Sequence, residues 1–481
     1  MSMDYEIVMG LEVHVELATK SKLFCSCSAE FGAEANENVC PACAGMPGML
    51  PLLNKKAVEL GIRAGLVTNC EITRTITFDK KNYFYPDLPT GYQITQLYAP
   101  ICRNGHVEIE TEAGKKRIRI KQIHIEEDAG KLVHDYLPGS SLVDFNRASV
   151  PLVEIVSQPD FRSAEEVVAY LEKLRSLLTF ADVSDCRMQE GSMRCDVNIS
   201  VRKAGSDKLG VRTEIKNLNS LKAIVRAIEY EAERHITALE TGCEELVQET
   251  RRWDENKGET YSMRDKEDAT DYRYFPNPEI LPVHISDEWI SEIRNSLPEL
   301  AHEKYERLTQ SLGLSDYDSR LITSSRNISD IFDRTMEYVN NPKEVANWII
   351  GDLASITKEE NKAYDEIVID CEKFGKIIKM VESKVINRTI GKKVLQLVFR
   401  DDIDPESYVR DNKLGMISDS GYLENIVKEV LSENEKSVSE FKAGNQKVIG
   451  FFMGQIMRKT QGKADPASVN SILMRELNNL R

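Results

Sequence analysis

The stretch GLEVHVEL, residues 10–17, alternates apolar and polar side chains with a period of two. Such alternation predicts a β-strand, because successive side chains of a strand point to opposite faces. The apolar side chains at positions 11, 13, 15 and 17 would contact the core, and Glu12, His14 and Glu16 would share the other face. That polar row could bind a hard cation, although a solvent-exposed polar face is the ordinary alternative.

The segments around this strand predict an α+β fold. Residues 1 to about 290 contain further short alternating stretches, such as RIRIKQIHIEE at 117–127, separated by Gly, Pro and Asn. Two helical patterns interrupt them, one opening with a capping box of Ser163 and Glu166 and one ending at Gly242. We therefore expect a mixed or antiparallel sheet with helices packed on it.

Beyond about Asp287, amphipathic helical patterns replace the strand patterns. A second break lies near RDDIDPESY, residues 400–408, where charge and proline interrupt the periodicity. The last segment is typical of two or three short helices separated by glycines and by Asp465-Pro466. We expect three domains: a sheet domain at residues 1–293, an all-α helical domain at 294–403, and a small helical tail domain at 404–481.

Further acidic side chains lie on strand patterns elsewhere in the first domain. Glu154 is embedded in the apolar run SVPLVEIVSQPD, where an ion without a cation or donors would cost on the order of several kcal/mol. Asp196 and Glu214 each share a polar strand face with basic neighbours, and Glu126 and Glu127 are adjacent at a strand end. Four strands that each carry an acid suggest a shared cleft for divalent metal and phosphate. The alternative is a set of buried ion pairs that hold the sheet together.

Four of the ten cysteines follow the first strand at metal-ligand spacing: Cys25, Cys27, Cys40 and Cys43. Thiolates in a C-x-C and a C-x-x-C pair can close a tetrahedron around Zn²⁺. The proline and glycine residues around the second pair provide the tight turns that a zinc knuckle needs. Incidental cysteines and a redox pair are the alternatives. Because no coordination position is left open, we expect a structural zinc.

The charge is unevenly distributed along the chain. A net charge of −15 argues against general coating of nucleic acid, but residues 442–481 contain seven Lys/Arg and two Asp/Glu. This basic segment could contact a polyanion, and a solvated helical face is the alternative. No apolar run approaches membrane-spanning length, and the first residues lack the pattern of a signal peptide. We expect a cytoplasmic protein with no membrane segment.

The sequence has no P-loop, no G-x-G-x-x-G opening a helix, no H-E-x-x-H and no G-x-S-x-G. A bound nucleotide would therefore not lie on a P-loop. Residues 78–96 and 249–279 interleave Lys and Arg with aromatic side chains. This pattern suits stacking on a base and neutralising phosphate, and equally a packed loop whose basic side chains extend to solvent.

Seven motifs along the chain resemble, in order, the B subunit (GatB) of the tRNA-dependent amidotransferase family. They are GLEVHVEL (10–17), FDKKNYFYPDLPTGYQI (78–94), EEDAGK (126–131), PLVEIVSQPD (151–160), GSMRCDVNIS (191–200), EIKNLNS (214–220) and DYRYFPNPE (271–279). Seven motifs in order are far more specific than any one of them. The resemblance extends over essentially the whole chain.

This resemblance implies an ATP- and Mg²⁺-dependent enzyme of the aspartyl/glutamyl-tRNA(Asn/Gln) amidotransferase type, a heterotrimer. The side-chain carboxylate of Glu-tRNA(Gln) or Asp-tRNA(Asn) would be phosphorylated and then amidated by ammonia. The partners would be an amidase (the A subunit), which releases ammonia from glutamine, and a small clamp protein (the C subunit). The first domain would be a cradle. A non-catalytic tRNA-binding adaptor and a metal-dependent phosphohydrolase are the competing interpretations.

The resemblance also implies roles for individual residues. Lys81, Glu127 and His14 would be catalytic, with Lys81 and Glu127 relaying a proton where an ammonia channel reaches the site. The four cysteines would form the zinc knuckle that some family members carry. Arg264, Lys266 and Arg273 are our own candidates for contacts to ATP or acceptor-end phosphate. The predicted Mg²⁺ ligands are Glu12, His14, Glu127, Glu154, Asp196 and Glu214, and the predicted tRNA contacts are Lys447, Arg458, Lys459 and Lys463.

Overall fold

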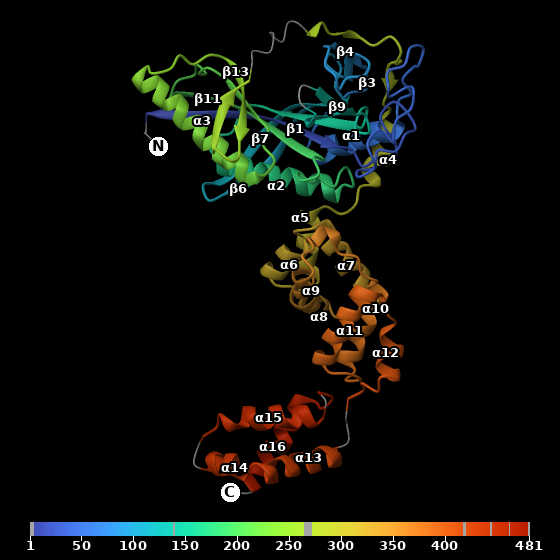
Figure 1. Ribbon diagram of the computed structural model, residues 1–481, viewed down its shortest axis with the longest axis vertical. Helices are drawn as coiled ribbons and strands as arrows, with labels where there is room; N and C mark the ends of the chain where they lie inside the picture. The colour runs from blue at the N-terminus through green and yellow to red at the C-terminus, as the bar shows by residue number, and fades with distance from the viewer. Residues whose placement is uncertain are drawn as a thin grey trace. The chain divides into compact units, whose positions relative to one another are not determined.

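The computed structural model describes residues 4–137, 140–263, 272–416, 420–442, 445–460 and 462–479 (Figure 1). The chain forms two compact units, Met1–Leu300 and Ala301–Arg481. The first unit contains the strands and the first four helices, and the second unit is helical. The α+β fold class predicted from the sequence is confirmed.

The first unit is built on a nine-stranded sheet in the order β14-β13-β12-β11-β1-β10-β7-β6-β2. Neighbouring strands are antiparallel except β12 and β13, which run parallel, so the sheet is mixed. The strand built on GLEVHVEL, β1, lies near the middle and pairs with β10 and β11. The bounds are β1 Tyr5–Glu16, β2 Glu71–Ile72, β6 Cys102–Thr111, β7 Gly114–Glu127, β10 Pro151–Ser157, β11 Met193–Lys203, β12 Thr213–Lys216, β13 Glu249–Asp254 and β14 Glu259–Ser262.

Three smaller sheets border this one. β4 (Asp79–Asn82) pairs with β5 (Tyr92–Thr95) and β15 (Phe275–Pro276), so the motif around residue 80 lies beside the motif around residue 275. The other two sheets pair β3 (Thr75–Ile76) with β16 (Val283–His284) and β8 (Lys131–Leu137) with β9 (Ser140–Asp144).

Helices cover the apolar face of the large sheet. α1 (Lys55–Val67) packs on β6 and β7, α2 (Ala164–Phe180) on β6, and α3 (Leu221–Thr241) on β11 (Figure 1). The predicted caps are present: the Ser163 side chain accepts from the Glu166 backbone N–H, and Gly242 ends α3 with a φ of 65°. Helix α4 (Asp287–Asn295) packs against α1 and completes the unit.

The second unit contains two separate apolar cores. One surrounds Trp348 and Phe374, and the other surrounds Phe452 and Leu473. The α-helices of the unit are α5 Ala301–Glu306, α6 Asp316–Ile322, α7 Arg326–Met336, α8 Pro342–Asn347, α9 Ala354–Glu359, α10 Cys371–Glu382, α11 Arg388–Asp401, α12 Pro405–Asp411, α13 Ser420–Glu433, α14 Glu435–Lys442, α15 Val448–Lys459 and α16 Pro466–Asn479; π-helical turns lie at Arg307–Ser311 and Trp348–Leu353, and a 3₁₀ turn at Tyr364–Glu366.

The glycines of the tail differ in their place relative to the helices. Gly450 and Gly454 lie inside α15 and do not separate helices, whereas Gly462 does lie between α15 and α16. A glycine in a helix costs only about 1 kcal/mol, and α15 buries Phe452 and Ile456 against the core. The prediction of two or three short helices separated by glycine and by Asp465-Pro466 is therefore confirmed for α15 and α16. Among the residues described, no helix has both the length and the apolar character needed to cross a membrane.

A buried charge cluster fastens α3 to the edge of the large sheet. Glu231 of α3 is fully buried, and its carboxylate lies 3.1 Å from Nε of Arg251 on β13 and 2.9 Å from Nη2 of Arg234. The Thr260 hydroxyl of β14 also donates to it. Glu249 of β13 lies beside the same two arginines, 2.8 Å from Arg251 and 3.6 Å from Arg234, so the cluster holds two acids and two bases. The cluster therefore fixes β13 and β14 to the helix.

We expect Glu231→Ala to lower the free energy of unfolding of the first unit by about 2 kcal/mol, because Thr260, Arg251 and Arg234 would lose a buried acceptor while Glu249 would still pair with both arginines. Urea unfolding followed by tryptophan fluorescence, to which Trp253 buried in β13 contributes, measures the change. Glu233→Ala is the matched control, since Glu233 is exposed on the same helix and should change stability by less than about 0.5 kcal/mol. Equal effects of the two substitutions would contradict the assignment.

Candidate active site

The polar faces of β1, β10, β11 and β12 form one continuous surface on the large sheet. The antiparallel register places Glu12 directly opposite Asp196, and His14 directly opposite Glu154. Glu214 lies one strand further, on β12. Residues far apart in the sequence are thus neighbours across the strands, because side chains opposite each other in a sheet lie on the same face.

One group on this surface consists of His14, Glu126 and Glu154. Nε2 of His14 lies 3.5 Å from Oε1 of Glu126 and 3.8 Å from Oε2 of Glu154. His124 of β7 contacts the same acids, with its Nε2 2.6 Å from Oε2 of Glu154. Burial lowers the pKa of His124, but the charges and hydrogen bonds of Glu154 and Glu126 outweigh it and raise that pKa to about 10.

A second group consists of Glu12, Asp196 and Glu214. Nζ of Lys216 lies 2.5 Å from Oδ2 of Asp196 and 2.5 Å from Oε1 of Glu214, and Asn198 donates to Glu12 at 3.0 Å. Burial, and the charges of Glu154 and Glu214, raise the pKa of Glu12. The acids of this group therefore gather around positive charge.

Each group can supply ligands to one cation. The candidate ligand atoms lie within 4.8 Å of one another in each group. Carboxylate oxygens are the ligands that Mg²⁺ and Ca²⁺ prefer, and the ammonium of Lys216 between two acids marks the place where a cation's charge is favourable. The donor sets thus fit divalent metal ions. Five of the six predicted ligands, Glu12, His14, Glu154, Asp196 and Glu214, are brought to this surface, and Glu126 joins them.

Both groups line one cavity of about 580 Å³, a volume in the usual range for small-molecule sites. Lys81 of β4 lies in its wall, with its ammonium 4.9 Å from the ring centre of Tyr272 and 5.4 Å from that of Tyr83. Burial alone would raise the pKa of Glu154, but the charges of His124 and His14 lower it below its usual value. The charge of Lys81 adds a smaller effect in the same direction. The cavity therefore combines acids, aromatic rings and one predicted catalytic lysine.

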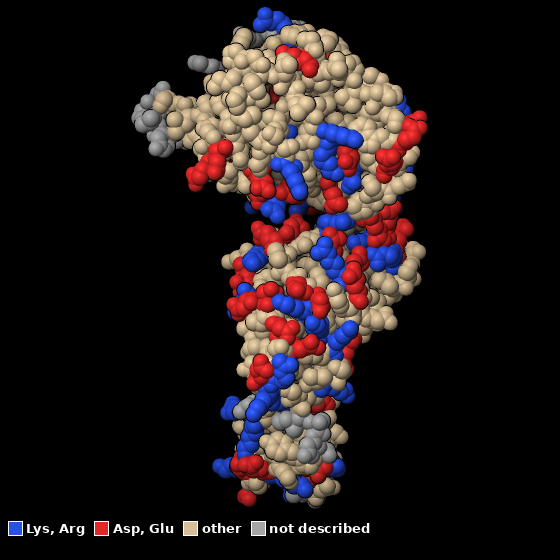
Figure 2. Space-filling view, turned by 90° about the vertical axis from the view of Figure 1, so that its right-hand side faces the viewer, with Lys and Arg blue, Asp and Glu red and all other residues tan. Residues whose placement is uncertain are grey.

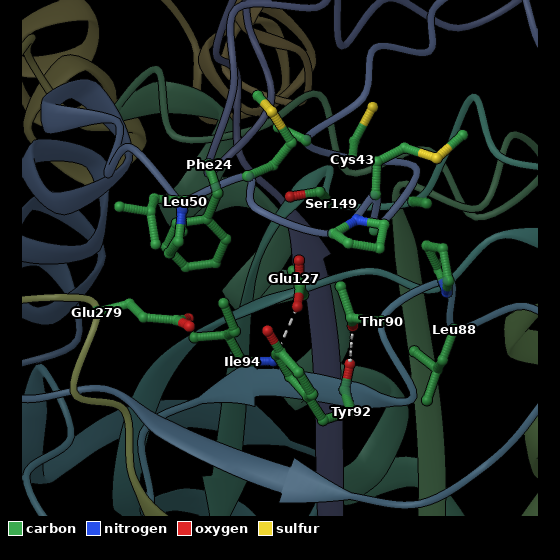
Figure 3. Close-up of a pocket in the computed structure, with 18 of the residues that line it drawn as sticks. Phe24, Cys43, Leu50, Leu88, Thr90, Tyr92, Ile94, Glu127, Ser149 and Glu279 are labelled. Carbon is green, nitrogen blue, oxygen red and sulfur yellow. Dashed lines mark hydrogen bonds between the residues drawn. The ribbon is translucent and has the colours of Figure 1, made fainter.

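Glu127 does not join either acidic group. It follows Glu126 on β7 and so points to the other side of the strand, into a separate cavity of about 280 Å³ (Figure 3). Its Oε1 accepts from the backbone N–H of Ile94 at 2.9 Å. Burial raises the pKa of Glu127 to about 7. The structure thus brings Glu126 to the place expected for Glu127, while Asp128 lies in the walls of both cavities.

The cavity around Glu127 is closed by the segment that follows the cysteines. Cys43 and residues 45–51 line it together with Leu88 and Pro89 (Figure 3). Gly45 has a φ of 67°, and a Cβ there would lie 2.7 Å from the carbonyl oxygen of Pro89. Only glycine allows the two segments to approach this closely.

The four cysteines form a compact cluster. Sγ of Cys43 lies 4.0 Å from Sγ of Cys27 and 3.9 Å from Sγ of Cys40, and the four sulfurs lie within 4.8 Å of one another. Ligands of a tetrahedral Zn²⁺ with bonds of about 2.3 Å lie about 3.8 Å apart. A hydrogen bond from the Cys25 thiol lowers the pKa of Cys43, although burial opposes this. All four sulfurs therefore fit a structural zinc.

Among the described residues, Arg273 does not line either cavity. Arg264 and Lys266 fall outside the described residues, and Arg273 is exposed beside Tyr272. In the second unit, Lys459 pairs with Glu429 and Glu433 of α13, at 2.8 Å in each case. The remaining predicted tRNA contacts are exposed at Lys447 and Arg458 and half-buried at Lys463.

The sequence analysis missed two site residues, Glu126 as a candidate ligand and His124 as the partner of Glu154. Both alternate with isoleucines in QIHIEE, residues 122–127, which signals one polar strand face. Because two acids are adjacent at the end of that stretch, the alternation alone does not decide whether Glu126 or Glu127 lies on the polar face.

Comparison with known proteins identifies two family matches. Residues 7–291 match the GatB/GatE catalytic domain, and residues 330–477 match the GatB domain. The chain is 52% identical over 473 residues, 98% of each chain, to the B subunit of the aspartyl/glutamyl-tRNA(Asn/Gln) amidotransferase of Lachnoclostridium phytofermentans. It is 52% identical to the B subunit of Caldicellulosiruptor saccharolyticus, over 99% of each chain, and 51% identical to that of Lachnospira eligens, over 98% of this chain and 99% of the relative.

The raised pKa of Glu127 predicts a pH-dependent loss of stability. In the unfolded chain the Glu127 carboxyl has its usual pKa, whereas in the folded chain its pKa is about 7. The ionised carboxylate therefore destabilises the folded state, and this loss of stability grows as the pH rises from the usual pKa towards 7. The stability advantage of Glu127→Gln over the unsubstituted chain should widen by about 1 kcal/mol between pH 6 and pH 8. Urea unfolding at both pH values measures this. Glu110→Gln, on the exposed side of β6, controls for loss of a surface carboxylate, and an unchanged difference for Glu127→Gln would contradict the prediction.

Proposed function

The chain belongs to the GatB family, and on that premise we propose that it is the subunit of a heterotrimeric amidotransferase that activates and amidates an aminoacyl group on tRNA. The substrates would be Glu-tRNA(Gln), Asp-tRNA(Asn) or both. The observation that carries the proposal is the meeting of two ligand groups, His14/Glu126/Glu154 and Glu12/Asp196/Glu214, in one cavity. A cytoplasmic location follows from a role in making aminoacyl-tRNA for translation.

The proposed reaction has two steps. A side-chain carboxylate is a poor acceptor for an amine, so one of its oxygens first takes the γ-phosphoryl group of ATP and ADP leaves. Ammonia then attacks the carbonyl carbon of the acyl phosphate, phosphate leaves with that oxygen, and the amide forms. Bound Mg²⁺ would supply neutralisation of phosphate charge.

The chain's own residues would bind and orient the reactants in this cavity. The two ligand groups would hold the metal ions, and His124 would orient Glu154 through the contact at 2.6 Å. Lys81 would be catalytic as a cation near the reacting carboxylate, and Tyr83 and Tyr272 offer faces on which a base could stack. Arg264, Lys266 and Arg273 are proposed for the phosphates of ATP or of the tRNA acceptor end.

Ammonia would reach this cavity past Glu127. A carboxyl with a pKa of about 7 is suited to remove the proton that prevents an ammonium ion from attacking, and Lys81 would complete the relay on the other side. Supporting this path, Asp128 belongs to the walls of both cavities.

The ammonia would come from the amidase partner, the A subunit, with the small C subunit clamping the assembly. The first unit carries exposed apolar side chains near the smaller cavity, including Leu50, Leu52 and Phe84. The face of this unit seen in Figure 2 has a broad area with few charged residues. Such a surface suits a lasting contact with a partner protein.

An experiment with the purified heterotrimer tests the catalytic role. Asp196→Asn should reduce amide formation, measured with ATP, glutamine and each misacylated tRNA, on the order of 100-fold or more, because one ligand group loses an anionic oxygen. Glutaminase activity and assembly of the heterotrimer should persist. Asp207→Asn, an exposed position, is the matched control. Full activity of Asp196→Asn would favour a non-catalytic tRNA-binding adaptor.

The tail is proposed to contact tRNA through Lys447, Arg458, Lys459 and Lys463. Lys459 already pairs with Glu429 and Glu433, whereas the described residues provide no ion pair for Arg458. Replacing Lys459 should therefore change the salt dependence of tRNA binding less than replacing Arg458. Filter binding over a range of salt concentrations should give a slope of log Kd against log salt that is smaller by about 1 for Arg458→Ala. Equal slopes for the unsubstituted chain and Arg458→Ala would count against this contact.

A further inference from the structure

Lys22 is a fully buried lysine in the turn between β1 and the first cysteine pair. Its backbone N–H donates to the carbonyl of Cys27 at 3.0 Å, and a bridge between Ser21 and Ser28 closes the turn around it. Lysines are almost never fully buried unless they are paired, because their charge loses its hydration. The groups that contact the Lys22 side chain therefore indicate its role.

The Nζ atom of Lys22 has two partners in the described part of the chain. It donates to the backbone carbonyl of Phe145 at 3.0 Å and to Sγ of Cys43 at 3.5 Å. The described residues place no carboxylate within 4 Å of it, whereas the other two buried lysines, Lys80 and Lys304, lie 3.0 Å from Glu279 and 2.9 Å from Asp333. The one acceptor here that can carry a full negative charge is the Cys43 sulfur.

We propose that Lys22 is the built-in counter-ion of the four-cysteine centre, donating a charge-assisted hydrogen bond to the Cys43 thiolate. Four thiolates around Zn²⁺ leave a net charge of −2, and burying that charge is costly without a nearby cation. Lys22 halves it at the one buried cysteine of the four. This arrangement also bears on the nature of the cluster, since four neutral thiols or a disulfide would leave the buried ammonium without an anion.

The same contact links the centre to the smaller cavity. Cys43 lies in the wall around Glu127, and residues 45–51 continue that wall. Phe145, whose carbonyl accepts the second hydrogen bond of Lys22, follows β9. Lys22 therefore holds the cysteine segment, which continues into the cavity wall, against the chain that leads into β10.

This inference rests on the zinc site proposed from the cysteines and does not depend on the amidation reaction. The metal content of the unsubstituted full-length chain tests the site itself: about one zinc per chain is expected, and its absence would overturn both the site and the role of Lys22. A chain that holds zinc while the Lys22 variants behave as the unsubstituted one would overturn the role of Lys22 alone.

Competition with a chromogenic chelator should give a zinc Kd for Lys22→Met at least tenfold higher than for the unsubstituted chain. Lys22→Arg should lie between the two, since it keeps the charge but not the shape. Lys20→Met removes an exposed lysine two residues away and should leave the Kd unchanged.

In the Co²⁺-substituted protein, Lys22→Met should move the sulfur-to-metal charge-transfer band to longer wavelength, because a hydrogen bond that stabilises the sulfur lone pairs is lost. An unshifted band and an unchanged Kd would sink the proposal.

A measurement on the unsubstituted chain covers the case in which Lys22→Met fails to fold. Acetylation of lysines, read by mass spectrometry, should spare Lys22 in the zinc-loaded protein and reach it after chelation, while Lys20 reacts equally in both. Lys22 that reacts as fast as Lys20 with zinc bound, or that stays protected after chelation, would contradict a counter-ion role.

Discussion

Carboxylates that share one face of a sheet repel one another, and the first unit is organised around that repulsion. Glu12, Asp196 and Glu214 are held within reach of one ion, and His14, Glu126 and Glu154 within reach of another. The register of β1 with its neighbours enforces these distances, because a slip of one residue would turn every side chain of a strand to the other face. Only cations, whether Lys216, His124 or metal ions, make the arrangement favourable. The buried core beneath the sheet and the Glu231 cluster at its edge keep the strands from relaxing apart.

The sequence allowed the local structure to be predicted where local chemistry decides it. Alternation identified the two faces of β1, Ser163 marked the start of α2, and Gly242 marked the end of α3, since caps and periodicity depend on residues only a few positions apart. The parallel pairing of β12 with β13 could not be predicted, because a long crossover through α3 joins them. Which of Glu126 and Glu127 faces the larger cavity could not be predicted, for a related reason. The end of β7 fixes which of two adjacent acids faces the cleft, and that depends on pairing with β10.

The tail illustrates the limit of composition. Its basic residues from position 442 onward were evident, but two of them pair with acids of α13: Lys459 with Glu429 and Glu433, and Arg475 with Glu424. Acidic and basic side chains are accordingly intermingled on the helical part of the surface in Figure 2. A count of charges does not reveal such pairing, since it depends on which helices pack together. Arg458 and Lys447 remain the more available cations of this segment.

The close approach of Gly45 to Pro89 gives the small cavity an unusual kind of boundary. Backbone atoms, and not side chains, meet at that point, so exchanging residues elsewhere in either segment leaves the spacing there unchanged. A library of substitutions aimed at enlarging this cavity would therefore find little freedom at its rim. Longer or shorter versions of the whole segment after Cys43 offer the better starting point for such engineering.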